Sequence, residues 1–326
     1  MCKKLIYLVS LILVLSMAGN GLAGVSNPIP ADGTIHEDTW ANIAWEGTGA
    51  SYDVYFGDNL DNVKDGTGDT FQGNQTTKFY VVGFPGFAFP DGLIPGTTYY
   101  WRIDEIQADG VTIHKGNVWS FSILAKTAIK PEPADGAEFV DPNNVVLNWA
   151  PGFGAKLHTV YTGTSFDEVN NAAGGLPQAA TNFSPGPLEA EKVYYWRVDE
   201  FDAAETYKGD VWSFTTPGAV GNPKPTNGDT GMQMNNILSW TPANSAASHE
   251  LYFGTDKETV RTAGTGSPEY IGPKTLGLES YDPGLLEPDA AYYWRVDEVD
   301  SQGNVSKGPL WSFTTGDFLL VEGFES

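Results

Sequence analysis

The sequence contains little cysteine and little positive charge. Its one cysteine, Cys2, lies in the leader described below, which leaves the rest of the chain without a disulfide, a thiol nucleophile or a cysteine metal ligand. Units of about 100 residues can bury enough apolar surface to fold without disulfides. Lysine and arginine total 18 against 41 acidic residues, a net charge of −23. Such a surface repels phosphate backbones and anionic lipid headgroups, which argues against a nucleic-acid partner.

Long apolar runs are also rare, and the one present is at the N-terminus. Two lysines precede the apolar run Leu5–Met17, and small residues at Gly21 and Ala23 suit cleavage before Gly24. We therefore interpret residues 1–23 as a signal peptide, which predicts a secreted or cell-surface protein. The alternative is an uncleaved anchor, but the run is shorter than the roughly 20 residues that span a bilayer. We expect no membrane insertion after signal cleavage.

A repeated unit occupies most of the remaining chain. The heptapeptide YYWRVDE occurs at Tyr194–Glu200 and Tyr292–Glu298, and as YYWRIDE at Tyr99–Glu105. Each copy begins with a Pro-x-Pro turn, passes through a tryptophan and a VYFG-like run, and closes on a KGDVWSF-like run. All tryptophans except Trp40 occupy these positions, which predicts a structural core made of Trp45, Trp101, Trp119, Trp149, Trp196, Trp212, Trp240, Trp294 and Trp311.

Each copy contains short runs of period-two alternation bounded by Gly, Pro, Asn and Asp, and no amphipathic helical stretch of useful length. An acidic turn is expected after each VYFG-like run. Strand-like runs at this spacing predict a seven-stranded β-sandwich. The sequence thus predicts an all-β chain with sandwiches at 27–124, 128–217 and 220–316 and a tail at 317–326.

The copies resemble fibronectin type III modules, which have an immunoglobulin-like fold. In that family a tryptophan on the second strand and a Tyr-x-hydrophobic-x-hydrophobic pattern on the sixth fill the core. Trp149 and the pattern Tyr194-x-Trp196-x-Val198 match these positions in the second copy. The Pro-x-Pro, VYFGT, YYWRVDE and KGDVWSFTT runs together resemble repeats of large exported bacterial proteins that often carry lectin-like (LamG or concanavalin-type) jelly-roll domains. The sixth-strand tryptophan and the trailing WSFTT depart from a typical animal module.

The tail GDFLLVEGFES at 316–326 resembles the opening of such a jelly-roll domain. This resemblance implies a truncated chain whose modules present a further domain. The alternative is a short tail that adds a strand to the last sandwich.

Strand geometry argues against a catalytic role for the heptapeptide. Side chains alternate between faces, so Trp196 and Glu200 share the core face while Arg197 and Asp199 share the other. The two acids therefore diverge, and they cannot form the convergent carboxylate pair, roughly 5–9.5 Å apart, that glycoside hydrolysis needs. We expect the arginines to lie on the surface, with their stems over aromatic rings and their charges paired with acids on adjacent strands: Arg102, Arg197 and Arg295.

The histidines do not form a recognisable site. His158 and His249 occupy equivalent positions that hold Tyr52 in the first copy, which predicts an aromatic strand position, and His36 and His114 stand alone in turns. There is no HExxH spacing, no Gly-x-Ser-x-Gly elbow and no phosphate-binding glycine loop. We predict no catalytic residue, no cofactor and no metal site. Calcium binding by the acidic surface is an alternative.

Two kinds of function remain. The first is a noncatalytic exported spacer or adhesion scaffold, because the proline-containing links AKTAIKPEP and TTPGAVGNPKP favour semi-rigid spacing. The second is carbohydrate binding by the aromatic insertion at 78–92, whose Phe84, Phe87 and Phe89 have no clear counterparts in the other copies. The alternative for these rings is that they fold back over the end of the sandwich. Candidate partners are an extracellular polysaccharide or a cell-surface protein. The truncated presentation arm of a lectin-like or polysaccharide-degrading protein is a further alternative.

Overall fold

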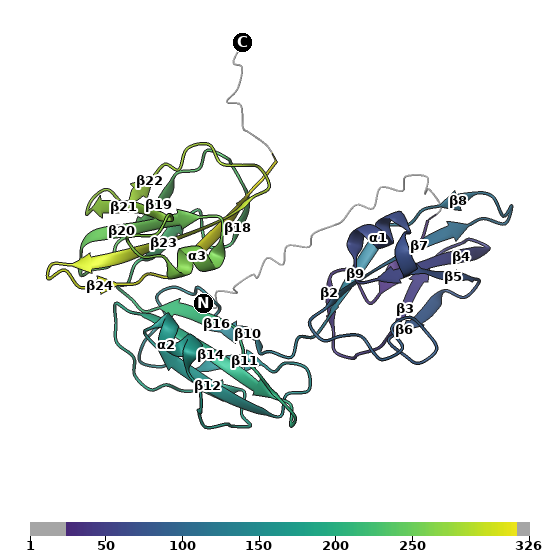
Figure 1. The fold of residues 1–326 in the computed structure, drawn as a ribbon, viewed down its shortest axis with the longest axis horizontal. Coiled ribbons are helices and arrows are strands. Elements are labelled where there is room, and N and C mark those ends of the chain that lie inside the picture. Colours follow the sequence, from purple (N-terminus) through teal and green to yellow (C-terminus); the bar gives the residue numbers. More distant parts are fainter. Residues whose placement is uncertain (1–23, 318–326) are drawn as a thin grey trace, which may run out of the picture. The chain divides into compact units, whose positions relative to one another are not determined.

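The computed structural model describes residues 24–317, so the predicted leader and all but the first residue of the predicted tail lie outside the described residues. The chain divides into two compact units with the boundary between Leu124 and Ala125, and each unit is described by itself. Strands dominate both units and form sheets (Figure 1). Buried hydrophobic residues form a core in each sandwich. The predicted fold class, all-β with tandem β-sandwiches, is confirmed. Within residues 24–317, the helices are all too short to cross a membrane.

The first unit is one sandwich. Its strands are β1 (Ser26–Ile29), β2 (Thr34–His36), β3 (Ala41–Glu46), β4 (Ser51–Gly57), β5 (Phe71–Gln75), β6 (Phe79–Val82), β7 (Thr98–Ile106), β8 (Ile113–His114) and β9 (Val118–Ile123). A helix, α1 (Leu60–Asp65), and a 3-10 turn, η1 (Gly68–Thr70), lie between β4 and β5. The smaller sheet has the order β1-β3-β6, and the larger has the order β2-β9-β7-β4-β5 with β8 paired to β7. Only β2 and β9 pair in parallel within this unit's named strands.

The second unit begins with a sandwich of seven strands. They are β10 (Ile129–Glu132), β11 (Leu147–Ala150), β12 (Leu157–Gly163), β13 (Asn182–Phe183), β14 (Val193–Phe201), β15 (Thr206–Tyr207) and β16 (Val211–Thr215), and the helix α2 (Phe166–Asn171) follows β12. One sheet has the order β10-β11-β13, and in the other β14 pairs with β12, β15 and β16.

The third sandwich completes the second unit. Its strands are β17 (Gly221–Lys224), β18 (Asp229–Met232), β19 (Leu238–Thr241), β20 (Ala246–Gly254), β21 (Tyr270–Thr275), β22 (Ser280–Tyr281), β23 (Ala291–Asp300), β24 (Val305–Ser306) and β25 (Trp311–Thr315), with the helix α3 (Lys257–Thr262) after β20. The sheets have the orders β17-β19-β22 and β18-β25-β23-β20-β21, with β24 on β23. The second and third sandwiches have separate cores, and the domain boundaries proposed from the sequence stay predictions.

Three tryptophans form the centre of each core. Trp101, Trp196 and Trp294, on the aligned strands β7, β14 and β23, are fully buried. Each lies 4.6–4.7 Å, between ring centroids, from the tryptophan of the last strand. A third tryptophan, on the smaller sheet, lies 6.3–6.5 Å from the same ring. Every one of the nine repeated tryptophans is at most 8% exposed. Each ring removes on the order of 200 Å² from water, which explains why the same positions recur.

A tyrosine corner closes one end of each sandwich. The first tyrosine of the heptapeptide accepts a hydrogen bond from the backbone nitrogen five residues earlier, at 2.9 Å for Tyr99, 2.8 Å for Tyr194 and 2.9 Å for Tyr292. Such a corner is a feature of immunoglobulin-like sandwiches.

The acidic turns expected after the VYFG-like runs are instead the three six-residue helices. Their N-terminal caps are Asn59, Ser165 and Asp256, whose side chains accept from backbone nitrogens of the first turn. These residue types are the preferred caps. A helix this short is not stable alone, so its anchor must come from the sheet.

Candidate functional site

An arginine of the central strand is buried in every sandwich. The expectation of surface arginines paired with an adjacent strand is wrong, because Arg102, Arg197 and Arg295 are at most 3% exposed and each pairs with the aspartate two residues further along its own strand. Arg197 Nε and Nη2 donate to the two carboxylate oxygens of Asp199 at 2.7 and 2.9 Å. Alternation correctly places both side chains on the outer face, but the short helix covers them there.

The same arginine holds the C-terminal end of that helix. In the second sandwich Arg197 Nη1 donates to Val169 O at 2.7 Å and to the carbonyl of Asn170, and Nη2 donates to Ala172 O at 2.7 Å. These terminal carbonyls have no partner inside a helix, and positive charge is favourable beside them. The guanidinium carbon also lies 4.6 Å from the centroid of Tyr161, so the charged group, rather than the stem that the sequence predicts there, lies over the aromatic ring. The arginine therefore fixes α2 to the sheet.

The paired aspartate holds the strand that returns from the hairpin. Asp199 Oδ1 accepts from Gly209 N at 3.0 Å, and the equivalent bonds are 3.1 Å in the first sandwich and 3.0 Å in the third. A side chain at Gly209 would collide with Val198 O, so the glycine at this position repeats for a steric reason. We call each arginine, aspartate and glycine set the arginine latch.

The glutamate that ends the heptapeptide is buried with a histidine in two sandwiches. Glu200 Oε2 bonds Nδ1 of His158, and Glu298 Oε2 lies 2.5 Å from Nδ1 of His249. Tyr52 takes the histidine position in the first sandwich. The sequence predicts only an aromatic position here and misses the pair. The sequence feature that could have predicted the pair is a glutamate on the core face of a strand, because a buried carboxylate needs a partner.

The pKa values reflect this burial. Burial raises the pKa of Glu200, although the hydrogen bond from His158 acts in the opposite direction. Burial alone lowers the pKa of His249, but hydrogen bonds and charges of Glu298 and Glu279 outweigh it and raise this pKa above its usual value. His158 and His249 are at most 4% exposed. Neither pair is accessible to a substrate, so we assign both a structural role.

The aromatic insertion of the first sandwich separates into a core ring and two exposed rings. Phe89 packs against Phe56 and Tyr99, with centroid distances of 5.6 and 5.0 Å. Phe84 and Phe87 are 52% and 42% exposed. Of the three residues proposed from the sequence, only Phe84 and Phe87 are therefore available to a ligand.

Trp40, which the sequence reasoning leaves without a role, adds a third exposed ring beside the insertion. It is 47% exposed and precedes β3, at the end where Ala41 pairs with Val82 of β6. A Cβ added at Gly83 would lie 2.9 Å from the Trp40 Cα, so the two segments are in contact. Trp40 is the one tryptophan outside the repeated core positions, and this feature of the sequence could have identified it as a candidate surface residue. We call Trp40, Phe84 and Phe87 the aromatic patch.

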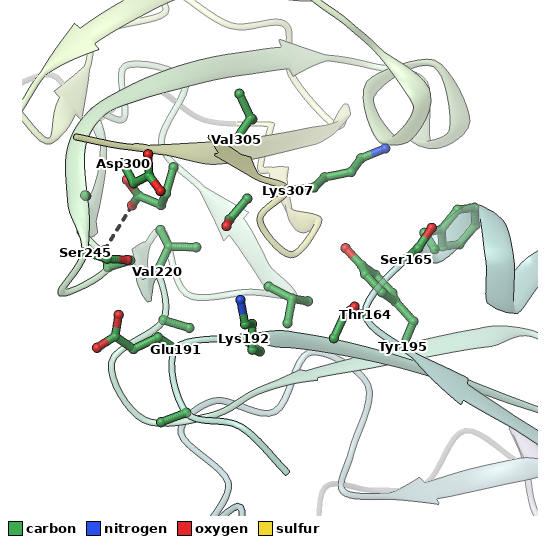
Figure 2. A pocket seen from close by; sticks show the side chains of 18 of the residues that line it. Thr164, Ser165, Glu191, Lys192, Tyr195, Val220, Ser245, Asp300, Val305 and Lys307 are labelled. Atoms are coloured by element: carbon green, nitrogen blue, oxygen red, sulfur yellow. Dashed lines mark hydrogen bonds between the residues drawn. The ribbon is translucent and has the colours of Figure 1, made fainter. Parts of the chain in front are cut away.

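A hollow of about 630 Å³ lies within the second unit between its two sandwiches (Figure 2). Lys192 and Tyr195 line it from the second sandwich, and Asp300 and Lys307 from the third. Burial lowers the pKa of Lys307, and the charge of Arg295 acts in the same direction. The buried Tyr195 hydroxyl donates to the carbonyl of Gly308 at 3.4 Å. The hollow is thus part of an interface between two packed sandwiches, with lysines and acids on both sides.

Among residues 24–317, no three His, Cys, Asp or Glu side chains are grouped so that they could hold a metal ion. Asp199 and Glu200 face opposite sides of β14, and both accept hydrogen bonds from structural partners. All seven residues of the heptapeptide in the second sandwich are therefore engaged in the core, the latch, the corner, the histidine pair or the interface.

The sequence matches no protein-family model and no curated protein. Among solved structures, the chain is similar to an alpha-L-rhamnosidase from Dictyoglumus thermophilum, with 21% identity over 30% of this chain and 12% of that one and a TM-score of 0.25. It is also similar to the FN1-FN3 domains of chicken CNTN1, with 12% identity over 90% of this chain and 97% of that one and a TM-score of 0.24. This chain spans about an eighth of the rhamnosidase, and similarity at this level says nothing of activity.

Proposed function

We propose that the chain is a noncatalytic exported scaffold whose sandwiches act as spacers, or as an adhesion stalk, at or outside the cell surface. The observation that supports this proposal most strongly is that the repeated residues make structural contacts. In all three sandwiches the tryptophans, the arginine latch and the terminal glutamate are buried in structural contacts. The parts of the chain that repeat therefore build modules and leave no convergent polar groups for chemistry.

Packing inside the second unit supports a spacer. Besides the Tyr195 bond, the guanidinium of Arg261 lies 4.5 Å from the Phe166 ring. The two carboxylate oxygens of Glu138 each lie 3.0 Å from Asn222 N at the start of β17. These contacts join the second and third sandwiches on several sides of the short link between them, and a spacer needs such a fixed joint.

The joint can be tested by pulsed electron spin resonance. The secreted chain as we propose it, starting at Gly24, has no cysteine, so spin labels can be placed on cysteines introduced at two exposed sites, Leu176 and Leu278. A single narrow distance distribution is expected, and the Arg261→Ala variant should broaden it. A broad distribution in the unmodified background would contradict the spacer role, because it would show two sandwiches that tumble independently.

Polysaccharide binding by the aromatic patch is a second candidate. The patch has three rings that are each at least 42% exposed and lie in or beside a segment absent from the other sandwiches. Exposed apolar surface of this kind marks binding sites, and flat rings can stack on sugar faces.

Affinity electrophoresis in gels that contain polysaccharide would test this candidate. Retardation should be lost in the Phe84→Ala and Phe87→Ala variants and kept in Phe71→Ala, which removes a ring that is 51% exposed from another strand of the same sandwich. Phe89→Ala is unsuitable because that ring belongs to the core. Equal migration of all variants with every polysaccharide would leave only the spacer role.

A further inference from the structure

Two equivalent surfaces face each other inside the second unit. Each surface, which we call the helix-side patch, contains the first two residues of the short helix, the outward tyrosine of the heptapeptide, the lysine before the latch glycine and the serine after the last-strand tryptophan. A hollow of about 380 Å³ between the second and third sandwiches is lined by matching members of both patches: Phe166 and Lys257, Tyr195 and Tyr293, and Ser213 and Ser312.

The charged residues on either side of this central hollow are placed reciprocally. On one side, Lys307 of the third sandwich and Asp167 of α2 line the same hollow. On the other side, Lys208 of the second sandwich lies with Glu258 of α3. Lys208 and Lys307 are equivalent in the repeat, as are Asp167 and Glu258. An exchange in which residue i meets j and j meets i is the mark of a two-fold, isologous contact. The residues that line these hollows thus follow an approximate two-fold relation between the second and third sandwiches.

The first sandwich carries a third copy of this patch. Leu60 is its first helix residue and is 46% exposed, whereas the equivalent Phe166 is 8% exposed. Tyr100 is half-buried, as is the equivalent Tyr293, whereas Tyr195 is buried, and Lys115 is exposed. Within the first unit, therefore, the patch remains open.

The helix-side patch of the first sandwich has charged and apolar residues at the same positions as the patches of the second and third sandwiches. Asp61 stands at the position of Asp167 and Glu258, and Lys115 stands at the position of Lys307 and Lys208. Lys64 occupies the position of Arg261, which stacks on Phe166, and Leu60 occupies the position of Phe166 itself. The patch of the first sandwich therefore contains both members of each pair: Asp61 with Lys115, and Lys64 with Leu60.

We propose that two copies of the chain associate through the helix-side patches of their first sandwiches about a two-fold axis. Asp61 then pairs with Lys115 of the partner subunit, Lys115 with Asp61 of the partner subunit, and the stem of Lys64 covers Leu60 of the partner subunit. The patches of the second and third sandwiches already face each other across one hollow, which leaves the patch of the first sandwich for a second copy. A second copy is thus the occupant whose charges match those of this patch.

Charge exchange gives a specific test by sedimentation velocity of the chain from Gly24 onward. The unmodified chain should form a dimer as its concentration rises to about 100 µM, near the weak end of specific association. Asp61→Lys and Lys115→Glu should each weaken the dimer at least about tenfold, because each places like charges opposite one another twice. Both positions are exposed, so circular dichroism and the thermal transition should show an intact fold.

The decisive measurement is the mixture of these two variants. An Asp61→Lys chain and a Lys115→Glu chain restore opposite charges at both contacts of a two-fold pair, so the mixture should dimerise although neither variant does alone. Leu60→Glu should abolish the dimer, and Leu176→Glu, at a site 92% exposed on the second sandwich, should not affect it. An unmodified chain that remains monomeric at about 100 µM, or a mixture that stays monomeric, would overturn the proposal.

Discussion

Replacement of Arg102 by alanine tests the arginine latch most directly. The side chains of Arg102 and Asp104 are 3% and 9% exposed, and the guanidinium donates to the carboxylate at 2.9 and 3.0 Å. The alanine variant leaves a buried carboxylate without its partner, a change that costs about 3–5 kcal/mol. The variant also frees the carbonyl of Val63 at the end of α1, which accepts from Arg102 at 2.6 Å. A sandwich of this size has a total stability of about 5–15 kcal/mol, so the loss is a large fraction of it.

Differential scanning calorimetry should show this loss as a lower melting temperature. A loss of 1 kcal/mol lowers the Tm of a domain this size by about 4–8 °C, so the transition of the first sandwich should fall by about 12 °C or more. Hydrogen exchange measured by mass spectrometry would assign the shifted transition to residues 24–124. Arg261, the only arginine outside a latch, provides the matched control, and Arg261→Ala should leave that transition unchanged.

A double variant separates the buried charge from the other contacts of the latch. Arg102→Met with Asp104→Leu removes both charges, so the remaining cost comes from the helix carbonyls and from Gly116 N, which loses its acceptor at 3.1 Å. We expect this cost to be about 1–3 kcal/mol. The reasoning is refuted if Arg102→Ala changes stability by less than about 1 kcal/mol, or if the double variant is no more stable than the single one.

Two further predictions concern other buried contacts. Gly209→Ala should destabilise the second sandwich by about 1–3 kcal/mol in urea unfolding, because its Cβ meets Val198 O. Gly264→Ala, where a Cβ meets nothing within 4 Å, should be nearly neutral. His249 has a raised pKa in the folded state, so its contribution to stability is complete below about pH 6.5 and is lost as the pH rises through the folded-state pKa. His249→Tyr should flatten this dependence, and an unchanged pH profile would show that the pair with Glu298 does not control it.

The sequence predicts the all-β sandwiches because period-two alternation and an internal repeat are local signals. Alternation alone puts Trp196 and Glu200 on one face and Arg197 on the other, and the structure agrees. It cannot show that the outer face is covered, since the cover is a helix of six residues with no periodic pattern to reveal it. The sequence therefore predicts a surface position for Arg197, whereas this side chain is 1% exposed.

The candidate binding residues were predictable only in part. Phe84, Phe87 and Phe89 look alike in sequence, but only Phe89 reaches the core, in a loop where Phe89 itself has a positive φ of 56°. Side-chain direction in an irregular loop depends on such backbone angles, and no repeat pattern encodes them. Trp40 was overlooked because its neighbours come from a strand pairing that joins segments about 40 residues apart.

The parallel pairing of β2 with β9, and of β18 with β25, bears on how the chain responds to force. A pull on the two ends of either sandwich loads the hydrogen bonds of such a pair together, in shear, whereas an antiparallel hairpin opens one bond at a time. In the second sandwich the corresponding segments form only one parallel bridge, Ala137 with Phe214, and three backbone hydrogen bonds join them. The pairing that is loaded in shear is therefore shorter there, and we expect the second sandwich to unfold at a lower pulling force than the first and third.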